Sequence, residues 1–115
     1  MQFLIKVCWG FALVLGLVFP STSQVIVDVS EVNSSFDEQH PLLSPNGDLY
    51  FTKAFHPENQ NGTVDPGDVW ISKVSNSHVF QKPIHANELS SSGYDVVVGF
   101  LDENQILVYH DGRGK

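Results

Sequence analysis

The chain has 115 residues, 42% of them hydrophobic and 17% charged, which is the composition of one small globular domain and not of a disordered segment. Its formal net charge is −7, and its six lysine and arginine residues are scattered along the chain. That distribution excludes a basic surface for phosphates, so no nucleic-acid partner is expected.

Residues 1–23 are typical of a signal peptide. One cation, Lys6, precedes an uncharged apolar run of 13 residues from Val7 to Phe19. A run of this length suits a signal-peptide core, because a membrane-spanning helix needs about 20 apolar residues. Small serines then fit a cleavage site before Gln24. We expect an exported protein whose mature chain has no transmembrane span; an uncleaved N-terminal anchor is the alternative.

The mature chain reads as strands separated by turn formers. Short β-branched and aromatic runs alternate with stretches rich in Pro, Gly, Asn and Ser, and apolar residues do not recur at helical spacing. The pattern therefore predicts an all-β, antiparallel fold. Residues 24–35 are expected to form an N-terminal strand or linker, and the strands that follow are predicted at 38–43, 48–54, 68–74 and 78–82.

The segment SPNG, residues 44–47, predicts a tight turn between the first two of these strands. Pro45 favours the second position of a type I turn, Asn46 tolerates the third, and Gly47 accepts the positive φ that a hairpin needs. Residues 38–43 should therefore pair antiparallel with 48–53. Pro41 has no N–H to donate, which favours a sheet edge or a bulge at that position.

A weak internal repeat has an offset of 58 residues. Phe36-Asp37 falls on Tyr94-Asp95, and Leu49-Tyr50-Phe51 falls on Leu107-Val108-Tyr109. Each copy reads aromatic, Asp, strand, turn, strand, which is typical of repeated β units. Asp37 and Asp95 each precede a first strand, so we expect both carboxylates to accept backbone N–H groups; a catalytic carboxylate pair is the alternative.

Three stretches resemble the WD-like propeller repeat of TolB-type proteins: DEQHPLLSPNGDLYFTK, DPGDVWISK and YDVVVGFLDENQILVYHDGRGK. The resemblance implies antiparallel four-stranded propeller blades, with residues 36–93 as the first blade and its linker and 94–115 as the start of a second. It also implies that Asp68 and Trp70 belong to a blade motif, and that Trp70 packs between neighbouring sheets with Tyr50, Phe51 and Phe80.

About one and a half blades fit in the chain, whereas propellers close with roughly 4–8. We therefore expect an N-terminal fragment of a larger propeller. The alternative is a small secreted β protein, which would leave a long sheet edge exposed.

Catalytic motifs are absent from the sequence: there is no nucleophile elbow, HExxH, P-loop or Rossmann glycine pattern. The single cysteine, Cys8, lies in the signal peptide, which leaves no disulfide or cysteine zinc site in the mature chain. We expect no enzyme activity within these residues and no cofactor. The five histidines are dispersed and are expected at surface or turn positions rather than as metal ligands: His40, His56, His78, His85 and His110.

The connection 55–67 between the second and third strands is longer than a hairpin requires. It offers a set of polar groups expected to face solvent: His56, Glu58, Asn59, Asn61 and Asp65, with Asp68 at its exit. We expect Asp65 and Asp68 to cap turns. Contact with a partner protein is the functional alternative, and a calcium site is a further one because Ca²⁺ prefers oxygen ligands.

The favoured function is a non-enzymatic binding or scaffold module of an exported bacterial cell-envelope protein, in the periplasm or at the outer membrane. By resemblance, its partners would be other envelope proteins, and peptidoglycan through an OmpA-like domain downstream. The alternative is the N-terminal propeller of a prolyl-oligopeptidase-type serine hydrolase whose catalytic domain lies beyond these residues.

Overall fold

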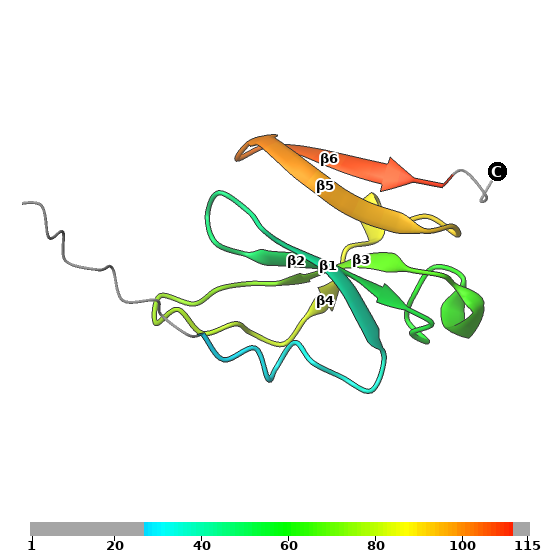
Figure 1. Ribbon diagram of the computed structural model, residues 1–115, viewed down its shortest axis with the longest axis horizontal. Helices are drawn as coiled ribbons and strands as arrows, with labels where there is room; N and C mark the ends of the chain where they lie inside the picture. Colours follow the sequence, from blue (N-terminus) through cyan, green and yellow to red (C-terminus); the bar gives the residue numbers. More distant parts are fainter. Residues whose placement is uncertain (1–26, 112–115) are drawn as a thin grey trace, which may run out of the picture.

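The computed structural model describes residues 27–111, and these form β-strands, two short 3₁₀ helices and no α-helix (Figure 1). The all-β prediction is confirmed. No helix in this part of the chain is long and apolar enough to cross a membrane. The predicted signal peptide and its cleavage before Gln24 lie outside the described residues. The elements are β1 (Asp37–Leu43), β2 (Leu49–Ala54), η1 (Gly62–Val64), β3 (Asp68–Ser72), β4 (Ile84–His85), η2 (Asn87–Leu89), β5 (Asp95–Asp102) and β6 (Gln105–His110).

Strands β1 to β4 form one antiparallel sheet in sequence order. The predicted hairpin is confirmed, since β1 pairs with β2 from Glu38↔Lys53 to Leu43↔Leu49. Its turn has the expected geometry: Gly47 has φ +90° and donates its N–H to the Ser44 carbonyl at 2.9 Å. Before this hairpin, residues 27–36 contain no strand.

Strand β1 is an edge strand with a bulge at its middle. The register shifts between Gln39 and Leu42, and His40 there adopts φ +52°. Pro41 sits inside this bulge, as its missing N–H predicted. A bulge twists an edge strand and interrupts its row of free backbone groups, which discourages pairing with another chain.

The fourth strand was predicted in the wrong place. Residues 78–82 contain one isolated bridge, Val74↔Phe80, and the sheet resumes only at β4, where Trp70↔His85 and Ile71↔Ile84 pair. His78 adopts φ +60° in a turn, and Pro83 has no N–H for the ladder. Pro83 lies between the bridge and β4 and interrupts the ladder there, whereas His78 lies in the turn that precedes Phe80.

Strands β5 and β6 form a second antiparallel hairpin, which Figure 1 shows crossing one side of the first sheet. Buried hydrogen bonds join its start to that sheet. Asp95 N–H donates to the Gly67 carbonyl at 2.8 Å, and the Thr52 hydroxyl donates to the Asp95 carbonyl at 2.7 Å. A second hairpin after Tyr94 is what the 58-residue repeat predicted.

The first sheet is apolar on both faces. Tyr50 lies between the two sheets, with its ring centroid 5.1 Å from that of Phe100. On that face, buried residues of the first sheet and its linker pack against Val97 of the hairpin: Tyr50, Val69 and Ala86. The other three aromatic residues expected in the core, Phe51, Trp70 and Phe80, lie in a cluster with Val32 and Leu49.

Candidate functional site

The connection 55–67 does not present all of its oxygen donors to solvent. Asn59 is buried, its amide donates to the Lys53 carbonyl at 2.7 Å, and its Oδ1 accepts from Trp70 Nε1 at 2.9 Å. Asn59 thus satisfies a strand carbonyl and the indole N–H at once. The expectation that it faces solvent was wrong, because its partners come from β2 and β3.

Asp65 and Asp68 are fully buried. Asp65 accepts backbone N–H groups from Asn61 at 3.0 Å and Gly67 at 2.9 Å, one on each carboxylate oxygen. Asp68 accepts the Gln60 N–H at 2.6 Å. Both carboxylates therefore hold the loop in shape, as expected for turn caps, although both were also expected to face solvent and do not.

His56 is half-buried and lies between two aromatic rings. Its ring centroid is 4.6 Å from that of Phe36 and 4.5 Å from that of Trp70, and its Nδ1 accepts the Glu58 N–H at 3.1 Å. Burial lowers the pKa of His56, and the nearby Lys53 charge lowers it further. Of the five predicted partner-contact residues, Glu58 and Asn61 are the exposed ones.

Lys53 supplies an unusual buried cation beside this loop. Its Nζ lies 4.4 Å from the centroid of the Trp70 ring and 3.7 Å from a carboxylate oxygen of Glu38. Burial lowers the pKa of Lys53, while the Glu38 carboxylate opposes that change. The cation–π contact and the ion pair offset part of the lost hydration.

The two aspartates of the repeat have different environments. Asp95 is fully buried, accepts the Ser91 N–H at 2.6 Å and contacts His110 Nδ1. Asp37 is exposed, and its carboxylate accepts a hydrogen bond from the Gln39 side chain. Asp95 therefore accepts a backbone N–H group, as expected, whereas Asp37 accepts a hydrogen bond from a side chain.

The sequence predicted surface or turn positions for all five histidines, but not all of them lie at the surface. His85 Nε2 is 2.6 Å from Asp68 Oδ2, and its side chain is 17% exposed. His110 contacts the buried Asp95 and is about half-exposed. Among residues 27–111, no group of three or more His, Cys, Asp or Glu side chains is placed to hold a metal ion.

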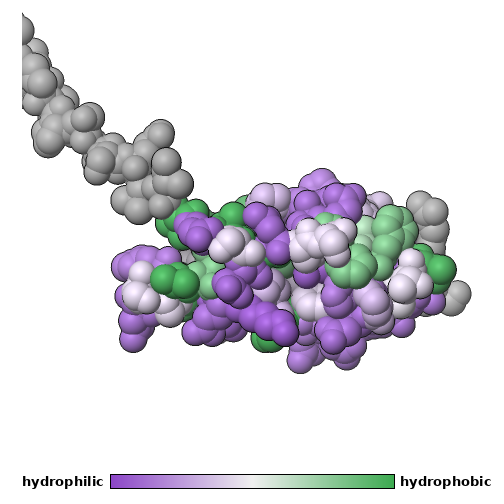
Figure 2. Space-filling view, turned by 90° about the horizontal axis from the view of Figure 1, so that it is seen from below, coloured by the Kyte–Doolittle hydropathy of each residue, from purple (hydrophilic) through white to green (hydrophobic). Residues whose placement is uncertain are grey.

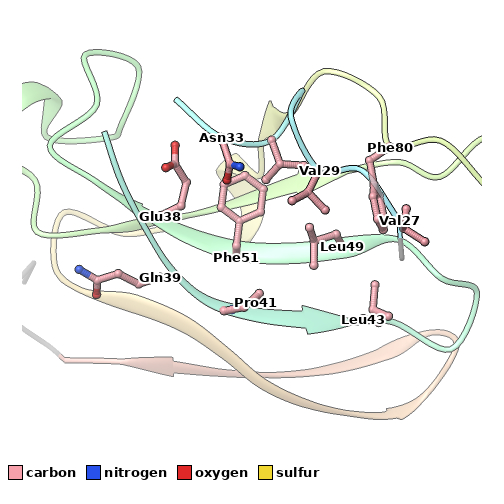
Figure 3. Close-up of a pocket in the computed structure, with 11 residues that line it drawn as sticks. Val27, Val29, Asn33, Glu38, Gln39, Pro41, Leu43, Leu49, Phe51 and Phe80 are labelled. Atoms are coloured by element: carbon pink, nitrogen blue, oxygen red, sulfur yellow. The ribbon is translucent and has the colours of Figure 1, made fainter. Parts of the chain in front are cut away.

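The sequence analysis missed an apolar groove of about 440 Å³ on the face of the first sheet opposite the hairpin. In Figure 3, Leu49 and Phe51 line its floor, and Val27 and Val29 of the N-terminal segment face them. Polar side chains gather at one end of this groove. Its lining is Val27, Val29, Val32, Asn33, Glu38, Gln39, Pro41, Leu43, Leu49, Phe51 and Phe80.

A second apolar surface lies on the β5–β6 hairpin. Four large apolar residues of these strands are exposed: Leu101, most of all at 66%, and Val98, Leu107 and Tyr109. Figure 2, which views the molecule from below and so from the side away from this hairpin, shows further hydrophobic patches on a largely hydrophilic surface, one of them beside the start of the described chain. Exposed apolar surface of this kind is typical of a protein contact.

Comparison with known families, with curated proteins and with solved structures finds no match to this chain. The site is therefore defined by its geometry: two apolar surfaces on an all-β scaffold, with a hydrogen-bonded polar loop at one end.

Proposed function

We propose that this chain is a non-enzymatic binding and scaffold module, built from propeller-type blades, in an exported protein of a bacterial cell envelope. The observation that supports this proposal best is that both sheets have two apolar faces. Every residue of β2 is buried; Leu49 and Phe51 line the groove, while Tyr50 packs toward the hairpin.

The hairpin repeats the same construction. Val97 and Phe100 pack toward the first sheet, whereas Val98 and Leu101 are exposed. A strand with apolar residues on both faces is typical of a layer that is covered on both sides. Stacked four-stranded blades provide that arrangement. The groove and the hairpin's outer face would then be contact surfaces for further sheets or for protein partners, with other envelope proteins as the expected class.

The experiment uses the full-length protein, expressed with its own N-terminus in a Gram-negative host. We expect to find it in the periplasmic or outer-membrane fraction. N-terminal sequencing should begin at Gln24. Chemical crosslinking should join it to specific envelope proteins. Leu101→Asp should abolish crosslinking without unfolding the chain. Gln105→Glu, which adds one negative charge at an exposed site of the same hairpin, should leave it intact.

Three results would contradict parts of the proposal. Labelling of the full-length protein by a serine-hydrolase probe would favour the propeller of a hydrolase instead. Retention of Met1 in the membrane fraction would favour an uncleaved anchor. Equal crosslinking of Leu101→Asp and wild type would show that the outer face of the hairpin is not the contact surface.

A further inference from the structure

Three segments meet at the buried carboxylate of Asp68, the first residue of β3. Its Oδ2 accepts the Gln60 N–H of the 55–67 loop at 2.6 Å and lies 2.6 Å from His85 Nε2 of β4. A single oxygen atom thus ties the loop and β4 to β3. Strand β4 depends on this contact, because it consists of two residues and two cross-strand pairs.

The same region continues into the linker toward the hairpin. The Gln60 side-chain amide donates to the Ser90 carbonyl at 2.8 Å. The Ser90 hydroxyl accepts the Val69 N–H at 3.0 Å and donates to the Ala86 carbonyl at 2.9 Å. A change in the protonation of Asp68 would therefore affect the packing of the loop, β4 and η2 together.

The other oxygen of this carboxylate, Oδ1, is buried and has no hydrogen-bond partner in the described structure. An ionised carboxylate is poorly solvated in such a position, so protonation is favoured. Burial is the largest cause that raises the pKa of Asp68, to about 6, against the hydrogen bonds from Gln60 and His85, while the Asp65 charge raises it further. His56 interacts electrostatically with His85, and the charged groups that act on His56 in turn are Lys53, Glu58 and Glu38.

We propose that Asp68 and His85 form a proton-operated latch, which takes up one proton in mild acid and then holds the loop and β4 against β3 more tightly than at neutral pH. The proton comes from solvent and is taken up by the Asp68 carboxyl group. The charge of that carboxyl then changes from −1 to 0, which removes a negative charge beside Asp65. His110 and Asp95 form a second pair, but that histidine is 48% exposed, so water solvates its charge.

The sign of the effect is opposite to ordinary acid destabilisation. A carboxyl whose pKa is higher in the folded state than in the unfolded state contributes stability below the unfolded value, and this contribution is lost as pH rises through the folded value. For Asp68 the window runs from about pH 4 to about pH 6, because the ordinary pKa of an aspartate is 3.8 and the pKa of Asp68 in the folded protein is about 6. Between pH 7 and pH 5, this single group should lower the unfolding equilibrium constant about tenfold.

Urea unfolding between pH 5 and pH 7.5 tests the latch, with the wild-type chain compared to Asp68→Asn. We expect the ratio of their unfolding constants to change about tenfold over this range. His110→Gln, in the second pair, should keep the wild-type pH dependence. Amide hydrogen exchange at Gln60 and Ala86 of the wild-type protein, corrected for intrinsic rates, should slow as the pH falls. The same amides of Asp68→Asn should not show this slowing.

A second measurement needs no variant, in case Asp68→Asn does not fold. The side-chain carboxyl carbon of Asp68 in the wild-type protein should titrate by NMR with a midpoint near pH 6. A midpoint near the ordinary value of about 4 overturns the proposal. A pH-independent ratio of unfolding constants would overturn it equally.

Discussion

Gly67 forms a bridge to Tyr94 where the two sheets meet, and Gly67→Ala should weaken their junction. A Cβ at this position would lie 2.5 Å from Thr52 Cγ2 and 3.0 Å from two carbons of the Tyr94 ring. Contacts below 3 Å require a neighbouring group to move. Thr52 is fully buried on β2, and its β-branched side chain has little rotamer freedom.

The expected size of the effect follows from these neighbours. Overpacking a well-packed core costs about 1–3 kcal/mol. Moving Thr52 also breaks its 2.7 Å hydrogen bond to the Asp95 carbonyl, which adds about 1 kcal/mol. We therefore expect Gly67→Ala to lower the free energy of unfolding by about 2–4 kcal/mol.

Urea unfolding of a double-mutant cycle isolates the cause. Thr52→Ser keeps the hydroxyl and removes the methyl group that the new Cβ would meet, so Gly67→Ala/Thr52→Ser should be more stable than Gly67→Ala alone. Gly99→Ala is the control, because its Cβ would make an ordinary 3.8 Å contact with Leu107. A loss below about 0.5 kcal/mol for Gly67→Ala, or no recovery in the double variant, would refute the reasoning.

Three further predictions concern single residues. Gly47→Val should destabilise the chain by about 1 kcal/mol or more in urea unfolding, because Gly47 holds φ +90°; an unchanged midpoint would contradict a turn of this type. Asn59→Ala should lower stability by about 1–3 kcal/mol, since it leaves the Trp70 indole N–H and the Lys53 carbonyl without their partner, and a shift in tryptophan fluorescence should accompany it. Because burial lowers the pKa of His56, its contribution to the free energy of unfolding is present above about pH 6.5 and is lost as the pH falls. His56→Gln should remove this loss of stability. Equal dependence of stability on pH in the variant and in wild type would contradict the prediction.

Local backbone chemistry allowed the sequence to predict much of the fold. The turn at 44–47, the bulge at Pro41 and the first hairpin depend on the φ preferences of glycine and on the missing N–H of proline, and these act over a few residues. The second hairpin was predicted from the 58-residue repeat, because both copies read strand, turn, strand. Strand β4 was misplaced by several residues, because β propensity at 78–82 does not reveal where pairing with β3 is interrupted.

The burial of polar side chains in and beside the 55–67 loop depends on partners that are distant in the sequence. Asn59 is buried because the Trp70 indole and the Lys53 carbonyl lie beside it. Asp68 acquires its raised pKa because burial strips its carboxylate of water and Asp65 lies near it. A loop composition rich in oxygen donors is equally compatible with solvent, a partner or a metal.

Tertiary structure alone decided the groove and the proton-operated latch. The groove brings together Val27, Leu43, Leu49 and Phe80, from four separate stretches of the chain. The latch joins Asp68 to His85 across two strands. The sequence determined that these strands would form and which of their residues are apolar, because strand formation and alternation are local properties. Which faces remain open, and which charges meet, follows only from the way one sheet packs on another, because packing brings together residues that are far apart in the chain.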